Sequence, residues 1–312
     1  LNENYFLGGR MRLDRRAAMR AIEEKVARQL KMNVVEAASG IYKITNAHMA
    51  DLIRRATVER GYDPRDFVLF VTGGAGPVHC GIYAAELGIR EVIVPLTSAV
   101  HGGLGLLASD VVFEYGKSDR LLFPPELEAV NAHFAGLTAK AEQDLKNMGI
   151  VGKEIVFVRS LDIRYRFQCH ELNVELPAGT AEIEAKDLDL LDSSFDELYE
   201  QSYGPGSGYR EAGKEIITFR LRAVGKIQSP NIKRYGRTQG GPDGAIKGKR
   251  EVYFEEAGKF LLTQIYDLHR IKPGMEIKGP GIIESPVTTI VVNPEDTAMM
   301  DVFRNMRLFI NS

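Results

Sequence analysis

The sequence contains no tryptophan, only two cysteines and almost no net charge, with 40 lysine and arginine residues against 42 aspartate and glutamate residues. A formal net charge of -2 gives no general attraction to nucleic acid or to an anionic membrane, so we expect neither partner. No apolar run approaches the roughly 20 residues needed to cross a bilayer. The first residues also lack the apolar core and cleavage site of a signal peptide. We therefore expect a cytoplasmic protein.

The two cysteines, Cys80 and Cys169, lie far apart and form no CxxC spacing. This pattern is typical of a reduced protein without a redox motif, and each thiol is expected to be a small buried side chain. The histidines lack the paired spacing of a metal site, so none is predicted. The composition of the 312 residues, with 44% hydrophobic content, is that of a globular protein, and its length favours two domains.

Residues 1–151 are expected to form an α/β domain. Apolar residues recur at a helical period over 13–31 and again over 35–60, and Gly61 is a natural stop for the second helix. Next comes the apolar run 67–71, which fits a strand covered on both faces. A glycine turn, a helix closed by Gly88, and a second buried strand at 91–95 follow this run. That order predicts a parallel βαβ unit.

Residues 152–312 are expected to form a β-rich domain, interrupted by one polar helix at about 185–202. Residues 228–250 are rich in Gly, Lys, Arg and Pro and show no apolar period, which predicts a long mobile surface loop. The stretches with strand-like patterns are 155–158, 162–167, 171–176, 216–224, 252–254, 259–265, 281–284, 288–292 and 306–310.

The glycine turn between the strand and the helix is the most informative segment. Gly73 and Gly74 carry no Cβ, so they can adopt positive φ and let a ligand approach the main chain. The start of the next helix offers unpaired N–H groups suited to a phosphate or a ribose oxygen, and Pro77 fits its first turn. The turn lacks the spacing of a dinucleotide fingerprint and the Gly-Lys-Ser/Thr of a Walker loop. A tight turn without a ligand, as in any α/β protein, is the alternative.

Several ordered motifs resemble the C-terminal half of the hydantoinase A / 5-oxoprolinase family, which includes the ATP-dependent subunits of acetone and acetophenone carboxylases. Together they cover nearly the whole chain. The matching segments are 6–9 (FLGG), 63–67 (DPRDF), 73–79 (GGAGPVH), 86–89 (ELGI), 105–110 (GLLASD), 162–165 (DIRY), 170–172 (HEL) and 279–284 (GPGIIE).

The resemblance implies the second lobe of an actin-like, sugar-kinase-like ATPase fold, followed by a β-rich C-terminal domain. Its Gly-Gly turn contacts the adenosine and the nearest phosphate of ATP, and Gly73, Gly74, Ala75 and Gly76 match that turn. His79 is a further candidate for a contact to the nucleotide, although it is equally suited to a structural role at the start of the helix. The phosphate loop of the first lobe has no counterpart here. Most contacts to Mg²⁺ and the γ-phosphate are therefore expected outside this chain.

The resulting hypothesis is a part of an ATP-dependent cyclic-amide hydrolase or ketone carboxylase that is inactive as an isolated chain. No catalytic residue is predicted. The resemblance implies a missing N-terminal lobe, a hydantoinase-B-type partner subunit and an oligomer. The alternative is a non-catalytic assembly module that binds no nucleotide. A self-sufficient kinase is disfavoured by the missing phosphate loops.

Overall fold

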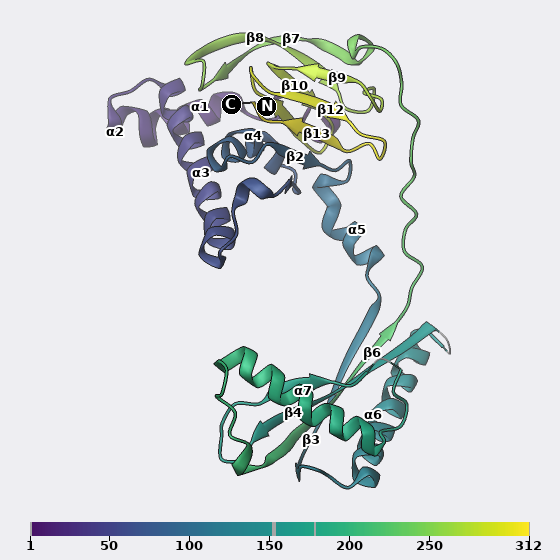
Figure 1. Cartoon of the computed structure of the whole chain (residues 1–312). Coiled ribbons are helices and arrows are strands. Elements are labelled where there is room, and N and C mark those ends of the chain that lie inside the picture. Colours follow the sequence, from purple (N-terminus) through teal and green to yellow (C-terminus); the bar gives the residue numbers. More distant parts are fainter. Residues whose placement is uncertain (1, 152–153, 178, 312) are drawn as a thin grey trace. The chain divides into compact units, whose positions relative to one another are not determined.

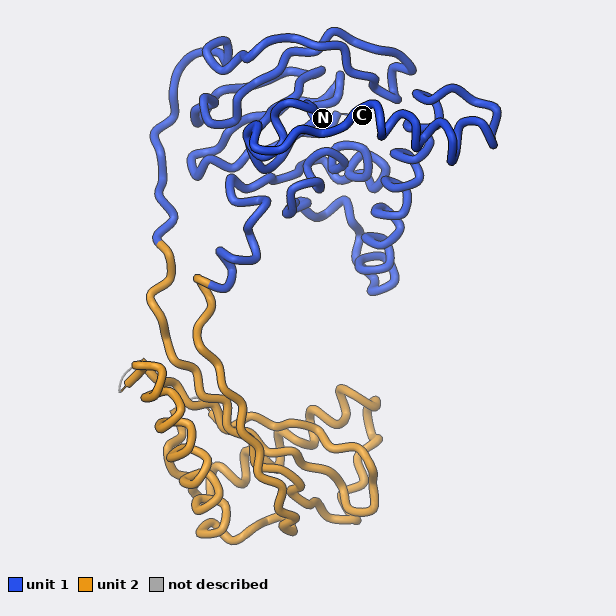
Figure 2. Tube along the Cα trace, turned by 180° about the vertical axis from the view of Figure 1, so that it is seen from behind, with its two compact units in different colours: residues 1–106, 231–312 blue, residues 107–230 orange. Residues whose placement is uncertain are grey.

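The computed structural model describes residues 2–151, 154–177 and 179–311, and the chain divides into two compact units (Figure 2). Unit 1 comprises residues 1–106 and 231–312, and unit 2 comprises residues 107–230. The division differs from the predicted domains 1–151 and 152–312. The reason is long-range strand pairing, because strands near both ends of the chain share one sheet in unit 1.

Helices make up most of the first part of unit 1 (Figure 1). The helices predicted at 13–31 and 35–60 are confirmed, although a π-helical turn interrupts the first. The second begins with a capping box, in which the side chains of Asn33 and Glu36 each accept from the other's backbone N–H, and it stops at Gly61, where φ is +82°. The helical segments are η1 (Phe6–Gly9), α1 (Arg15–Ile22), η2 (Glu23–Ala27), α2 (Arg28–Leu30), α3 (Val34–Thr57), η3 (Val58–Arg60), η4 (Pro64–Asp66), α4 (Gly76–Leu87), η5 (Ser98–Val100), α5 (His101–Ala108, which crosses into unit 2) and η8 (Asp243–Ala245).

Two sheets complete unit 1. One has the order β1-β2-β13-β12-β9, and the other has the order β11-β10-β8-β7. In the first sheet β2 pairs parallel to β1 and antiparallel to β13, so the end of the chain closes the sheet that the βαβ unit begins. The strands are β1 (Leu69–Phe70), β2 (Glu91–Val94), β7 (Ile246–Phe254), β8 (Lys259–Asp267), β9 (Glu276–Lys278), β10 (Gly281–Glu284), β11 (Thr289–Val292), β12 (Thr297–Met300) and β13 (Met306–Phe309).

The βαβ unit is confirmed: β1 and β2 are parallel and α4 connects them. The strand predicted at 67–71 is reduced to two residues, and the expectation that both its faces are covered is wrong. Val71 is buried and Leu69 packs on the core, whereas Phe67, Val68 and Phe70 are each about half exposed. The physical reason is that only the face of β1 that carries Leu69 and Val71 packs against the core of unit 1.

Unit 2 is an antiparallel sheet of order β3-β6-β4-β5 with two helices packed against it (Figure 1). Apolar side chains from both helices and from the strands, such as Phe134, Phe195 and Phe219, form the larger of two core clusters, and a smaller one includes Leu145 and Leu221. The stretches predicted as separate strands at 155–158 and 162–167 are a single strand. The elements are β3 (Val111–Leu122), α6 (Leu127–Asn147), β4 (Ile155–Tyr165), β5 (Leu172–Glu175), α7 (Ala185–Tyr203), η7 (Arg210–Ala212) and β6 (Lys214–Gly225).

Three local expectations need correction. The loop predicted over 228–250 ends earlier, because β7 begins at Ile246, and whether the rest is mobile stays a prediction. Cys80 is buried as expected, but Cys169 is exposed, since it lies in the turn between β4 and β5. The short strands β9 and β12 were not predicted. None of the described helices combines the length and the apolar character needed to cross a membrane.

Candidate functional site

The glycine turn between β1 and α4 is open. Residues 72–75 are exposed, and Gly73 has a φ of +90°, a conformation that a residue with a Cβ adopts only with strain. Its N–H donates to the carbonyl oxygen of Ser98 at 2.7 Å, which fixes the turn against the segment that follows β2. The main chain of the glycine turn is therefore exposed, as the sequence indicated.

Gly74 serves a different purpose from the one predicted. Its φ is not in the left-handed region, so conformational freedom does not explain the glycine. A Cβ at this position would lie 3.1 Å from the carbonyl oxygen of Val287. The side-chain hydroxyl of Thr288 donates to the carbonyl oxygen of Gly74 at 2.9 Å. Gly74 thus permits close contact with the turn that joins β10 to β11.

Helix α4 begins at this turn without a side-chain cap. Its N-cap residue is Ala75, which offers no acceptor, and Pro77 lies in the first turn as expected. Among the described residues, the backbone N–H groups of Gly74, Ala75 and Gly76 donate to no protein group. Three free donors at the positive end of a helix of 12 residues form a local environment suited to an anion.

A cavity of about 310 Å³ lies beside the turn, entirely within unit 1. Its walls come from three segments that are distant in sequence: the N-terminal segment, the start of α4, and the β10–β11 turn. Most of the wall is apolar, with Tyr5, Phe6, Val78 and Val287 among the contributors. The lining residues are 2, 5–7, 74, 75, 78 and 284–289.

Glu284 closes the cavity at the end of β10 and is only 1% exposed. Its carboxylate accepts from Arg250 at 2.6 Å and from Lys247 at 3.0 Å, and both cations come from β7. Burial alone raises the pKa of Glu284, but the hydrogen bonds from these two cations outweigh it and hold the pKa below its ordinary value. The Lys247 ammonium also lies 3.4 Å from the centre of the Tyr5 ring. Lys247 therefore connects the N-terminal segment to the second sheet, because it contacts both Tyr5 and Glu284.

His79 contacts α3 and is absent from the residues that line the cavity. Its ring stacks on Tyr42 at 4.8 Å, and its Nδ1 lies 3.0 Å from Oδ1 of Asn46. The Asn46 amide oxygen can accept here only from a protonated Nδ1. Burial lowers the pKa of His79, which favours the neutral ring. The geometry favours the structural alternative, in which His79 attaches the first turn of α4 to α3.

The turn residues 73–76 were identified from the sequence, whereas the cavity walls were not. Residues 5–7 and 284–289 reach the turn only through tertiary packing, so no local pattern connects them. One signal was present: residues 6–9 and 279–284 belong to the motifs that carry the family resemblance. The acidic residue that ends the apolar run 281–283 was a second signal, because a charge there requires a partner.

Comparison with known proteins gives consistent results over the whole chain. The chain is 31% identical over 304 residues to the acetone carboxylase beta subunit of Xanthobacter autotrophicus and 30% identical over 300 residues to the caprolactamase subunit alpha of Pseudomonas jessenii. Each comparison covers 94% of this chain but 42% of the relative. The chain therefore spans less than half the length of these relatives.

Comparison with solved structures gives the same two kinds of relative. A nucleotide-free structure of acetone carboxylase matches 99% of this chain and 44% of its own chain, with a TM-score of 0.88 at 30% identity. The ATP-dependent caprolactamase from Pseudomonas jessenii matches 100% of this chain and 45% of its own, with a TM-score of 0.70. The hydantoinase/oxoprolinase family model matches residues 1–115, and the model of the hydantoinase/oxoprolinase C-terminal domain matches residues 125–309. The chain belongs to the hydantoinase/oxoprolinase family.

Proposed function

We propose that this chain forms one wall of an ATP site in a larger ATP-dependent enzyme. A phosphate of the nucleotide binds at residues 73–76, and the adenosine occupies the adjoining cavity. The observation that supports this most strongly is the pairing of two features: free N–H groups of residues 74–76 at an uncapped helix start, and an apolar cavity directly beside them.

The residues present fit the nucleotide in size and chemistry. A cavity of about 310 Å³ lies at the lower end of the range for small-molecule sites, roughly 300–1,000 Å³. The apolar side chains of Phe6, Val78 and Val287 offer a surface for a flat base, and the backbone N–H groups offer donors to phosphate oxygens. We assign His79 to positioning α4, because its ring is engaged with α3.

The same residues do not fit a magnesium ion. Among the described residues no group of three or more His, Cys, Asp or Glu side chains is arranged to hold a metal. Glu284 is the one carboxylate among the described residues that line the cavity, and its oxygens are already bonded to Lys247 and Arg250. Protein ligands for a nucleotide-bound Mg²⁺ therefore belong to residues outside this chain.

The proposed reaction is transfer of the γ-phosphate to an unreactive substrate oxygen, either that of a cyclic amide or that of a ketone enolate. Phosphorylation converts this oxygen into a good leaving group, which makes ring opening or carboxylation feasible. The share of this chain is to hold the nucleotide in position, which is a large part of catalysis in phosphoryl transfer. Support comes from two solved relatives, an acetone carboxylase that carries out ATP-dependent acetone carboxylation and an ATP-dependent caprolactamase.

We also propose that the complete protein has an N-terminal lobe that this chain lacks, a hydantoinase-B-type partner subunit, an oligomeric assembly and a cytoplasmic location. The length of the relatives supports a larger assembly, because this chain spans 42% of the acetone carboxylase beta subunit and 42% of the caprolactamase subunit alpha.

Isothermal titration calorimetry with ADP, adenosine and pyrophosphate tests the proposal. ADP is expected to bind weakly to the isolated chain. Adenosine and pyrophosphate are each expected to bind more weakly than ADP, because each reaches only the cavity or only the turn. Absence of any ADP binding, with cooperative thermal unfolding showing an intact fold, would instead favour the assembly module without nucleotide binding.

A further inference from the structure

The main chain of the glycine turn has little conformational restraint of its own. Gly73 and Gly74 lack a Cβ, so the peptide planes on either side of them have a wider rotational range than those of other residues. A site that binds its ligand through backbone N–H groups is effective when those groups are held in place before the ligand arrives. Contacts from outside the turn therefore have to supply the restraint.

Two other segments of unit 1 supply hydrogen bonds to the turn. The carbonyl oxygen of Ser98, which follows β2, accepts from the N–H of Gly73 at 2.7 Å. The hydroxyl of Thr288, in the turn between β10 and β11, donates to the carbonyl oxygen of Gly74 at 2.9 Å. Within the described part of the chain, Thr288 is the one residue whose side chain forms a hydrogen bond to residues 73–76.

The hydrogen bond from Thr288 fixes the direction of one N–H group. The carbonyl of Gly74 and the N–H of Ala75 belong to the same peptide unit, which is trans. In a trans peptide unit these two groups point in opposite directions. Because the carbonyl points at Thr288, the N–H of Ala75 points away from the β10–β11 turn. This N–H is one of those that donate to no group among the described residues.

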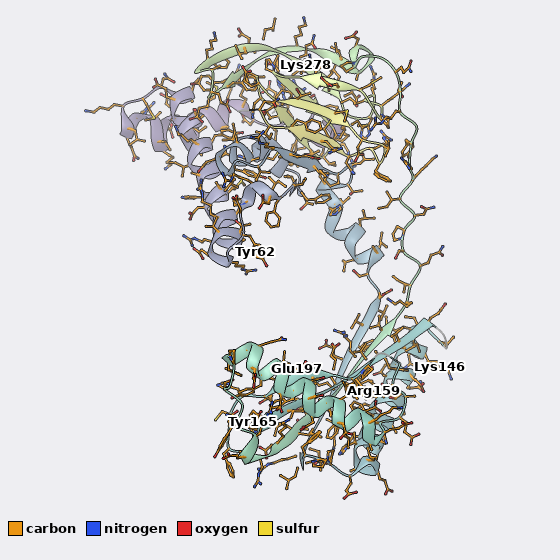
Figure 3. The ribbon with its side chains drawn as sticks, viewed as in Figure 1. Tyr62, Lys146, Arg159, Tyr165, Glu197 and Lys278 are labelled. Carbon is orange, nitrogen blue, oxygen red and sulfur yellow. The ribbon has the colours of Figure 1, made fainter. Side chains whose placement is uncertain are left out.

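The backbone of Thr288 is itself held in place. Thr288 is only 7% exposed. Its carbonyl oxygen accepts from the N–H of Ser285 at 2.9 Å, and its N–H donates to the hydroxyl oxygen of Ser285 at 3.1 Å. The turn follows β10, which begins shortly after Lys278, the last residue of β9 and labelled in Figure 3. The hydroxyl of Thr288 therefore comes from a backbone that is fixed through both its N–H and its carbonyl oxygen.

We infer that Thr288 is a positioning residue, which orients the N–H of Ala75 for a phosphate of the nucleotide. The inference rests on the proposed function, because it assigns a role within the same site. It divides the binding of the nucleotide into two parts. The hydroxyl of Thr288 contributes to the binding of the phosphate through the peptide unit that it holds, and it contributes nothing to the binding of the adenosine.

The test compares two substitutions of Thr288. Thr288→Val keeps the shape of the side chain but removes the hydroxyl, whereas Thr288→Ser keeps the hydroxyl. Calorimetric titration of each chain with ADP, pyrophosphate and adenosine measures the three affinities. We expect Thr288→Val to lose about three- to tenfold in affinity for ADP and for pyrophosphate, as for the loss of one hydrogen bond, and to keep its affinity for adenosine. Thr288→Ser should restore the affinity for ADP and for pyrophosphate.

Thr263→Val on β8 is the matched control. Thr263 is 0% exposed, and its hydroxyl also donates to a backbone carbonyl oxygen, that of Leu261, at 2.9 Å. Thr263 is absent from the residues that line the cavity. The control therefore removes an equivalent hydrogen bond elsewhere in unit 1. It should lower the midpoint of thermal unfolding and leave the affinity for all three ligands unchanged, which is the result that a purely structural role of Thr288 would also give.

Three outcomes overturn the inference: unchanged affinity of Thr288→Val for ADP, equal losses for pyrophosphate and adenosine, or no recovery in Thr288→Ser. Failure of the proposed function is distinguishable, because the wild type then binds no ADP. In that case the order parameter of the Ala75 N–H, measured by NMR relaxation, decides whether Thr288 holds this group. It should fall in Thr288→Val and stay constant in Thr263→Val, and a constant value in both variants would contradict the inference.

Discussion

A negative charge introduced at Ala75 should weaken nucleotide binding without destabilising the fold. Ala75 is exposed, caps α4 with ordinary helical backbone angles, and lines the cavity. In Ala75→Asp the new carboxylate favours the helix by about 0.3–1 kcal/mol, because it lies at the positive end of the helix dipole. The same carboxylate repels a bound phosphate. At a separation of about 5 Å and an effective dielectric constant of roughly 20 to 40, two like unit charges repel by about 1.7–3.3 kcal/mol.

This repulsion corresponds to a loss of ADP affinity of roughly 20- to 250-fold. The assay is calorimetric titration with ADP, combined with thermal unfolding of the same protein, whose midpoint should stay constant or rise. Ala75→Asn is the matched control, because it has the same shape without the charge and should lose only a few-fold. Unchanged ADP affinity in Ala75→Asp would refute the placement of a phosphate at this turn. Equal losses in the two variants would show that the effect is steric.

Two further predictions concern the stability of unit 1. Glu284→Gln should lower the free energy of unfolding by about 2 kcal/mol at pH 7, a value reduced from that of fully buried pairs because both cations are partly exposed. Because the pKa of Glu284 is lowered in the folded state, its contribution to the free energy of unfolding is present above the unfolded pKa of about 4.3 and is lost as pH falls through the folded pKa. Urea unfolding at pH 7 and pH 3 should therefore show that the free energies of unfolding of the variant and the wild type converge at acid pH. Gly81→Ala should destabilise by about 1–3 kcal/mol, because its Cβ would lie 2.5 Å from Nδ2 of the buried Asn293. Gly40→Ala on α3 is the control, because a Cβ there would meet nothing within 4 Å, and it should be neutral or stabilising. Thermal unfolding of both variants checks this, and a loss of stability at Gly40 as large as at Gly81 would contradict the steric explanation.

The helices could be predicted from the sequence because their signals are local. Helix α3 begins at a capping box and stops at Gly61, and α4 has Pro77 in its first turn and stops at Gly88, where φ is +72°. Each of these signals depends on residues within a few positions of the helix end, so no knowledge of tertiary packing is needed. The same holds for the glycine turn, whose exposed main chain follows from its own residues.

The sheets could not be predicted to the same extent, because strand partners are chosen by contacts between distant residues. Nothing local indicates that Leu308 pairs with Val92, which places the last strand of the chain beside β2. The predicted boundary at 151/152 failed to anticipate the compact units for the same reason. Strand β3 was assigned to the first domain, yet it pairs along its length with β6, so that Val111 lies opposite Gly225.

The candidate site illustrates why this limit matters for function. The part proposed to face a phosphate, residues 73–76, lies in one local turn and was predicted from the sequence. The part proposed to face the adenosine requires residues 5–7 and 284–289, and residues 284–289 are positioned by the pairing of β10 with both β8 and β11. Thr288 completes the arrangement through its hydrogen bond to Gly74. A local motif therefore indicates which ligand class to test, whereas the shape of the pocket has to come from the fold.

The order of the units along the chain has a consequence for how the site is maintained. The family models divide near residue 120, but unit 1 draws one sheet from both sides of that division, and unit 2 lies between its two parts. Residues 1–115 alone would contain the glycine turn but would leave β2 without β13 and would lack the wall formed by residues 284–289. In the proposed function the turn alone would contact only a phosphate, whereas the adenosine would need the cavity beside it. The smallest part of this chain that carries the proposed site is unit 1, with both of its segments present.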